Sequence, residues 1–221
     1  MMSKIWLVNV IRIEASFDDG SAYDLRTADM MNSYGIDTTF YIPVNWQRHL
    51  MAKHIDPLSP NDIKALSTSF TIGSHGVNHE LLTRVSEATQ DREILGSILY
   101  WQEQGYNVDS FCYPRGYYDE DIKNKVIKAG YKSARTVKVG NLDPANDPFE
   151  TETTVHIGYD RDEYNTDWLT YAKEKVLEAI EKDQAGEEVV YHFWGHSEEI
   201  WRYQQYDRVG EFLRYLTERL R

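Results

Sequence analysis

Residues 15–26, ASFDDGSAYDLR, carry an apolar segment into two adjacent aspartates and a glycine, after which a helical pattern begins. A buried strand that passes directly into a helix is half of a parallel βα unit. Neighbouring carboxylates at a strand end repel each other, so their presence favours a function that uses negative charge. Asp18 and Asp19 are therefore the first candidates for chemistry.

The same order of apolar segment and helical pattern recurs along the chain. About seven such units in one domain favour a barrel over an open sheet. Neither GxGxxG nor GxxxxGK[ST] follows any of these strands, so nucleotide binding has no support, and residues 1–221 are expected to form a single domain. Strands are predicted at 4–17, 38–42, 69–74, 110–113, 132–137, 153–157 and 188–194, and helices at 23–34, 60–67, 87–104, 120–129, 166–183 and 207–220.

Composition excludes several classes of partner. The formal net charge of −12 argues against nucleic acid and anionic membranes, which both require a basic surface. No apolar stretch is long enough for a transmembrane helix. The apolar N-terminus carries Asn9, Arg12 and Glu14 and is interpreted as a strand rather than a signal peptide; together with the single cysteine this predicts a cytoplasmic protein. The 16 tyrosines and 6 tryptophans fit a sugar-binding surface or an aromatic core.

Two histidines follow the third predicted strand, in TIGSHGVNHELLTRVS at residues 71–86. His75 and His79 are four residues apart, which would place both imidazoles on one face of a helical turn, within reach of one cation. By itself this spacing more often marks surface or capping histidines. A carboxylate from another strand end changes that interpretation, and the pair Asp18–Asp19 offers one, because active residues of a barrel gather where strands end.

Two imidazoles and one carboxylate leave an open position on a tetrahedral ion, as a catalytic zinc site requires. The second aspartate is then free to accept a proton from water, whose pKa such an ion lowers to about 7. The last predicted strand ends in FWGH, residues 193–196, where His196 is placed to act as a general acid. His192 would lie deeper on the same face, as a core or supporting histidine.

These residues, in this order, resemble the polysaccharide deacetylases of carbohydrate esterase family 4, the NodB-homology domain, over about residues 5–220. SFDDG (16–20) is similar to the first family motif and HGVNH (75–79) to the second, although the family often has Ser or Thr where Gly76 stands. CYPRG (112–116), TDW (166–168) and FWGH (193–196) are weaker matches to the third, fourth and fifth motifs.

The resemblance implies a fold, a reaction and a set of roles. The fold is a distorted, TIM-like α/β barrel, (β/α)7–8, and the reaction is metal-dependent hydrolysis of N-acetyl groups on amino sugars. By position, Asp18 becomes the base and His196 the acid, whereas Asp19, His75 and His79 become the metal ligands. The cofactor would be zinc, with cobalt, nickel or manganese as alternatives, because such a ligand set accepts several divalent ions.

The weaker motifs supply supporting roles. The family places the backbone N–H after the third-motif proline in the oxyanion hole, which here is that of Arg115. The fourth motif makes Asp167 the support of the acid histidine, with Asp160 as a competing candidate.

One departure from the family concerns the arginine that normally opens the third motif and orients the catalytic aspartate. Cys112 stands there instead, and we hypothesise that Arg135, at the end of the next strand, supplies the guanidinium; a solvated strand-end charge is the alternative. Cys112 as a nucleophile with His196 as its base has no other support, and a small buried strand residue is the favoured interpretation.

The leading functional prediction is a metal-dependent deacetylase of an amino-sugar-containing saccharide, with a carbohydrate as its partner. Since no signal peptide is recognised, a surface-polysaccharide precursor is expected rather than an extracellular polymer. The alternatives are hydrolysis of another non-peptide C–N amide bond and a non-catalytic carbohydrate-binding relative. Trp46, Tyr117, Tyr118, Trp194 and Trp201 lie on or near predicted loops, where they would stack on sugars or pack internally.

Overall fold

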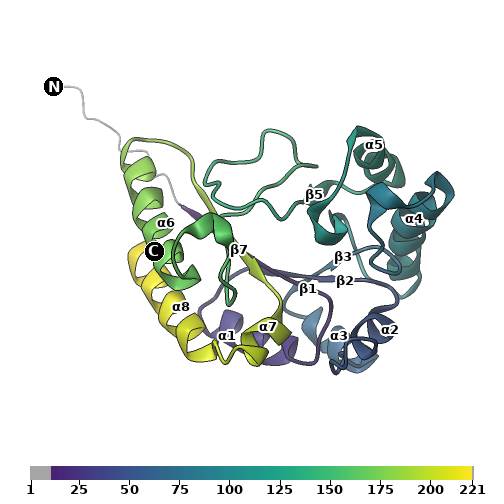
Figure 1. The fold of residues 1–221 in the computed structure, drawn as a ribbon, viewed down its shortest axis with the longest axis horizontal. Helices are drawn as coiled ribbons and strands as arrows, with labels where there is room; N and C mark the ends of the chain where they lie inside the picture. Colours follow the sequence, from purple (N-terminus) through teal and green to yellow (C-terminus); the bar gives the residue numbers. More distant parts are fainter. Residues whose placement is uncertain (1–10, 221) are drawn as a thin grey trace.

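The computed structural model describes residues 11–220. Its centre is a 7-stranded sheet in which every neighbouring pair is parallel, in the order β5-β4-β3-β2-β1-β7-β6. The sheet curls into an open barrel, which confirms the predicted distorted (β/α) architecture with seven strands (Figure 1). The strands are β1 (Arg12–Asp18), β2 (Thr38–Ile42), β3 (Thr71–Ser74), β4 (Ser110–Cys112), β5 (Ser133–Arg135), β6 (Val155–His156) and β7 (Val190–Gly195).

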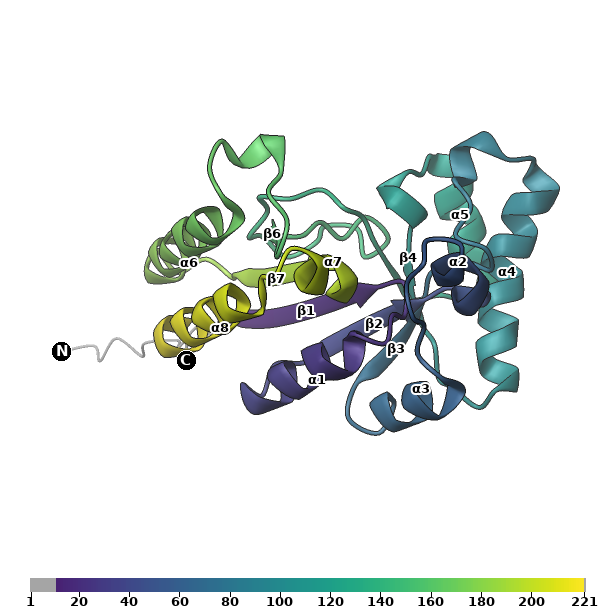
Figure 2. The ribbon, with the colours of Figure 1, turned by 60° about the horizontal axis from the view of Figure 1, so that its bottom comes forward.

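Helices surround the sheet, with α4 and α5 packed together at one edge and α6 and α8 at the other (Figure 2). Within residues 11–220, none of them is long and apolar enough to cross a bilayer. The helices are α1 (Asp24–Ser33), α2 (Trp46–Met51), α3 (Pro60–Leu66), α4 (Glu87–Glu103), α5 (Glu120–Ala129), α6 (Trp168–Gln184), α7 (Ser197–Arg202) and α8 (Tyr206–Leu220), and 3-10 turns lie at Leu82–Arg84, Pro114–Gly116 and Asp162–Tyr164.

Most helices begin where the sequence predicts because a side chain caps the first turn. Ser59 and Asp62 form a capping box ahead of α3, and Ser86 accepts a hydrogen bond from Thr89 N at the start of α4. Two short helices, α2 and α7, were not predicted. Neither has a side-chain hydrogen bond at its N-cap, and each is only 6 residues long. The sequence therefore contains neither a capping signal nor a long enough repeat of hydrophobic residues to predict them.

The alternation of side chains along each strand separates the core from the site. Phe17, Phe40 and Phe193 are fully buried, and Phe193 packs edge-on against Phe212 of α8. The intervening residues of β1 include Asp18, which opens into a cavity at the carboxyl ends of the strands. The predicted first strand begins at residue 4, but the part before residue 11 lies outside the described residues.

Candidate active site

All but two of the predicted site residues line one cavity of about 230 Å³ at the carboxyl ends of the strands. A larger cavity of about 570 Å³ opens at the other ends of the strands, but Asp19, His75 and His79 do not line it. We therefore place the candidate site in the smaller cavity. Its lining consists of Asp18, Asp19, Lys53, His75, His79, Arg115, Val137, Trp194 and His196.

Asp18, the last residue of β1, is held by a guanidinium from another strand. Arg135 Nη2 lies 2.5 Å from both carboxylate oxygens of Asp18, which is 2% exposed. Burial alone raises the pKa of Asp18, but the charge of Arg135 lowers it below its ordinary value. The carboxylate is consequently ionised at neutral pH, as a base must be.

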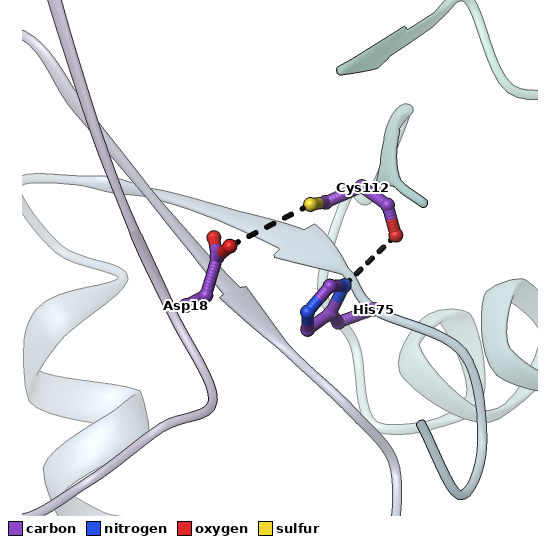
Figure 3. Close-up of side chains that lie close together, drawn as sticks. All are labelled: Asp18, His75 and Cys112. Atoms are coloured by element: carbon purple, nitrogen blue, oxygen red, sulfur yellow. Dashed lines mark hydrogen bonds between the residues drawn. The ribbon is translucent and has the colours of Figure 1, made fainter. Parts of the chain in front are cut away.

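The position of Arg135 follows from strand register. Cys112 of β4 and Arg135 of β5 are paired neighbours, so an arginine displaced by one strand still reaches Asp18. The thiol of Cys112 donates to Asp18 over 3.7 Å, and His75 donates from Nδ1 to the Cys112 carbonyl over 2.8 Å (Figure 3). The guanidinium also faces the Trp194 ring, 4.8 Å from its centroid. The structure thus places Arg135 where the hypothesis requires, and its effect on hydrolysis stays a prediction.

Asp19 is turned away from Asp18 by an unusual backbone. Its φ is 81°, which is rare for a residue with a side chain, and Gly20 follows with φ 75°. A Cβ on Gly20 would lie 2.9 Å from Ile42 Cγ2, so the turn requires glycine there. The two adjacent carboxylates therefore enter different surroundings.

Imidazoles surround Asp19. His79 Nε2 and His75 Nε2 lie 3.6 Å and 3.8 Å from Oδ1, whereas His49 Nε2 and Lys53 Nζ lie 3.2 Å and 3.0 Å from Oδ2. Oδ1 is buried and has no hydrogen-bond partner among residues 11–220. A buried carboxylate oxygen that faces two ring nitrogens fits a bound divalent cation in chemistry and in geometry.

The protonation states of the two predicted histidine ligands suit metal binding. Burial lowers the pKa of His75, and burial lowers that of His79 to about 3, so both rings are neutral at pH 7. Because a carbonyl can only accept, the bond from His75 Nδ1 to Cys112 fixes the proton on that nitrogen. Nε2 of His75 is left with its lone pair toward Asp19.

The segment that carries His75 and His79 is a loop and not the predicted helical turn. Gly76 and His79 have φ values of 79° and 58°, which no helix accommodates. Glu93 of α4 holds the loop instead: its Oε2 accepts from Val77 N at 2.9 Å and from Asn78 N at 2.8 Å. A Cβ on Gly76 would lie 2.9 Å from that same oxygen, so glycine makes room for the carboxylate.

His196 follows β7 and is oriented by Glu199, which the sequence analysis did not identify. His196 donates from Nδ1 to Glu199 Oε2 at 2.9 Å, and His156 donates from Nε2 to the same oxygen at 3.0 Å. Burial alone lowers the pKa of His196, but the bond to Glu199 raises it to about 10. The imidazolium therefore keeps its proton at neutral pH, as a general acid must.

The prediction that Asp167 supports His196 is wrong, because Asp167 serves the start of α6. It accepts from Leu169 N, from Thr170 N and from the Thr170 hydroxyl, and it pairs with Arg208. The competing candidate Asp160 accepts from Trp168 N at 2.8 Å on the same helix end. Glu199 could have been found from the sequence as a carboxylate three residues after His196, a spacing that meets on a helix.

Arg115 lies in the turn after β4, at the rim of the cavity. Its φ of 57° is again positive, and Gly116 packs so tightly on Val137 that a Cβ would lie 2.3 Å from Cγ2. The strained residue is thus one that lines the cavity. The oxyanion role of the Arg115 N–H stays a prediction.

Several alternative roles are decided by burial. Cys112 is fully buried, and burial raises the pKa of its thiol well above the ordinary value, which opposes a nucleophilic role. His192 lies deeper in the barrel, with Nε2 at 2.9 Å from Ser16 Oγ. Trp46 is a core residue, 6% exposed, whereas Tyr117 and Trp201 are 59% and 51% exposed and remain candidates for sugar stacking.

The family model described as polysaccharide deacetylase matches residues 9–134, which is more than half of the 221-residue chain. This chain belongs to the polysaccharide deacetylase family. The predicted family is thereby confirmed. A comparison with curated proteins finds no match.

Solved structures of similar proteins share the fold. The Streptococcus pyogenes deacetylase PplD in complex with acetate is 22% identical, with a TM-score of 0.56 over 63% of this chain and 62% of PplD. The family 4 carbohydrate esterase from Streptomyces lividans in complex with acetate is 13% identical, with a TM-score of 0.58 over 95% and 90% of the two chains. At these identities the likeness shows the fold alone, and this chain spans less than two thirds of PplD.

Proposed function

We propose that this polysaccharide deacetylase family member is a metal-dependent hydrolase that removes the N-acetyl group of an amino sugar within a saccharide. The observation that carries the proposal is the division between two adjacent carboxylates. Asp19 directs an unpaired oxygen at imidazoles, and Asp18 is held separately by Arg135. His196 lines the same cavity, so a base, a cation site and an acid surround a single space.

Asp19, His75 and His79 would hold the divalent ion, and zinc is the first candidate. When bound, the ion supplies a Lewis acid that polarises the acetamide carbonyl and lowers the pKa of water. Both histidines are already neutral, so binding displaces no proton from their rings at pH 7.

Asp18 accepts the proton of the attacking water. Its lowered pKa keeps it ionised, and the buried guanidinium of Arg135 fixes the carboxylate within the cavity. The backbone N–H of Arg115 donates to the oxygen of the attacked carbonyl as negative charge develops there. A cavity of about 230 Å³ suits an acetamide group, and the rest of the saccharide would lie across the rim near Tyr117.

His196 donates its proton to the amide nitrogen as the bond between this nitrogen and the carbonyl carbon breaks. The sugar keeps the nitrogen as a free amine, and the acyl group is released as acetate. Glu199 supports this step by stabilising the imidazolium through Nδ1, so that Nε2 carries the transferable proton. His156 donates to the same Glu199 oxygen and holds that carboxylate in place.

The test is acetate release by the purified, metal-loaded protein from N-acetylglucosamine and from its oligomers. We expect release that is lost on chelation and restored by a divalent ion, with Asp18→Asn as the inactive control. Preference for N-acetylglucosamine and short oligomers over long oligomers would extend the proposal to surface-polysaccharide precursors. Bound metal without acetate release from any acetylated amino sugar would refute deacetylation and leave a carbohydrate-binding protein.

A further inference from the structure

A separate cavity, of about 390 Å³, contains none of the predicted metal ligands and neither the base nor the acid. Its walls carry Tyr159, from the loop after β6, and Tyr203, which follows α7. These side chains are 41% and 47% exposed, and their rings are 6.0 Å apart and inclined by 51°. Because the rings do not stack on each other, part of each ring face is left for a ligand. The lining consists of Gly158, Tyr159, Asp160, Trp168, Tyr203 and Gln205.

Contacts between distant segments fix the shape of this cavity. Gly158 has a φ of 80°, and a Cβ on it would lie 2.7 Å from Ile200 Cγ1, so glycine lets the loop pack directly on α7. The buried Trp168 donates from Nε1 to Gln205 Oε1 at 2.9 Å, and Gln205 Nε2 donates to Tyr203 O at 2.8 Å. The cavity is therefore held in place by the fold, as most binding pockets are.

The chemistry of the walls fits a sugar ring. A pyranose has C–H groups on its face and hydroxyl groups around its edge, so it is bound by aromatic faces together with a few polar atoms. Tyr159 and Tyr203 supply the faces. Asp160 Oδ1 accepts from Trp168 N at 2.8 Å, which orients the carboxylate and leaves Oδ2 to accept from hydroxyl groups. Of the described residues that line the cavity, none is basic, so an anionic ligand is disfavoured.

Ring contacts connect this cavity with the active site. Tyr159 stacks on His156, with ring centroids 5.5 Å apart, and His156 packs edge-on against His196 at 5.6 Å. A hydrogen bond also joins the two cavities: Arg161, in the loop after β6, donates from Nη1 to Val137 O at 3.3 Å, and Val137 lines the catalytic cavity. A saccharide with its acetylated residue in the catalytic cavity would therefore extend over Tyr159.

We propose that this cavity is a saccharide subsite, which binds a sugar residue of the same chain as the residue that is deacetylated. The proposal rests on the proposed function, because it takes the substrate to be a saccharide, and it adds a requirement on length. The sugar ring lies against Tyr159 and Tyr203, and its hydroxyl groups donate to Asp160. A single N-acetylglucosamine fills only one of the two cavities, so oligomers should be the better substrates.

Support of the acid is the rival explanation for Tyr159. If its ring serves only to hold His156, and through it Glu199, removal of Tyr159 should lower kcat for every substrate. Tyr203 packs on Tyr159 and tests the subsite from the other wall. A subsite role predicts that its removal weakens the binding of oligomers and leaves the monosaccharide unaffected.

The experiment compares Tyr203→Ala and Tyr203→Phe with Tyr100→Ala as the matched control. Tyr100 is a half-buried tyrosine of α4, which lies at the other edge of the sheet from α6. The metal-loaded proteins give kcat and KM for acetate release from N-acetylglucosamine and from its dimer, trimer and tetramer. Calorimetry in an Asp18→Asn background gives the Kd of the same saccharides without turnover, and circular dichroism confirms that each variant is folded.

We expect wild type and Tyr100→Ala to prefer oligomers over the monosaccharide by about tenfold in kcat/KM, a typical effect of one added aromatic contact. Tyr203→Ala should lose this preference through a rise in KM and Kd, whereas Tyr203→Phe, which keeps the ring face, should retain it. Equal kcat/KM for monosaccharide and oligomers in the wild type, or an unchanged preference in Tyr203→Ala, would overturn the proposal.

The same measurements separate the subsite from the reaction. Acetate release without a preference for oligomers would leave deacetylation standing and refute the subsite. Binding of oligomers that depends on the Tyr203 ring, but without acetate release, would support the subsite and refute only deacetylation. Neither binding nor release would refute both.

Discussion

Asp18 and Asp19 are neighbours in the chain, yet each enters a different half of the site. Asp18 meets a buried guanidinium and a thiol, and Asp19 meets three imidazoles and a lysine. Both carboxylate oxygens of Asp18 contact the guanidinium of Arg135, so neither is left for a metal. Asp19 pairs with Lys53 through Oδ2 only, and its buried Oδ1 has no hydrogen-bond partner among residues 11–220, which favours binding of a cation there.

The difference originates in one backbone turn. Asp18 ends a regular strand and points into the barrel, and the positive φ of Asp19 directs the next side chain toward α2 and the histidine loop. Two aspartates with identical chemistry thus acquire different functions because the backbone turn points their side chains in different directions. Substitutions on each side should therefore have separable effects.

The largest effects should come from the carboxylates themselves. Asp19→Asn removes the anionic ligand, and we expect loss of stoichiometric metal along with all acetate release. Asp18→Asn should keep metal Kd near that of the wild type while kcat falls by about 10²–10⁴-fold, the usual range for a lost general base. Metal content and kcat are measured for both variants. Loss of metal from Asp18→Asn would contradict the division in which Asp19 binds the metal and Asp18 acts as the base.

Arg135→Ala should have the next largest effect, on activity and on stability together. It leaves the buried Asp18 carboxylate without its partner, which typically destabilises a protein by about 3–5 kcal/mol. Urea unfolding at pH 7 measures this change. The double variant with Asp18→Asn serves as the control, because a neutral amide no longer needs the cation and should recover part of the stability. Full hydrolysis by Arg135→Ala would show that Arg135 does not position the base.

Glu199→Gln should change the pH dependence of activity more than its maximum. Burial lowers the pKa of His196 but Glu199 raises it to about 10, so the acid form persists into alkaline solution in the wild type. Without that carboxylate the proton is lost at lower pH, and the alkaline limb of kcat should move toward neutrality by one or more pH units. If the alkaline limb of kcat is unchanged in Glu199→Gln, a group other than His196 determines the loss of activity at high pH.

The same pair links stability to pH. Because the pKa of His196 is higher in the folded state than its ordinary value of about 6.5, the stabilisation is complete below that pH. It is lost as pH rises through about 10. Thermal unfolding of wild type and Glu199→Gln should therefore differ most in mildly acidic solution and converge in alkali.

The smallest effect should come from Cys112→Ala. The thiol is buried with a raised pKa, so it is not a nucleophile, and its weak donation to Asp18 adds little to the Arg135 contact. We expect kcat within about threefold of the wild type, given that small buried substitutions usually act on stability. An inactive Cys112→Ala variant that still binds metal would support the alternative in which Cys112 is a nucleophile.

Most of the fold could be predicted because its signals are local. Strand and helix periods and the caps at Ser59 and Ser86 lie within a few residues of the elements that they define. The short helices α2 and α7 have no such signals, and each carries a residue that the sequence analysis missed, His49 and Glu199. Helices of 6 residues are stabilised mainly by their tertiary contacts. These contacts involve residues distant in sequence, so a local sequence pattern does not predict them.

The sequence by itself determined the order of the βα units and the grouping of Asp18, Asp19, His75, His79 and His196 in one site, since parallel strands bring their carboxyl ends to one edge. Only the tertiary structure decided which partner each of them has. Strand register brings Arg135 beside Cys112, the start of α6 takes Asp167, and Glu199 turns toward His196. The physical reason is that strand ends are set by the local chain, whereas hydrogen-bond and ion-pair partners are set by distances between segments far apart in sequence.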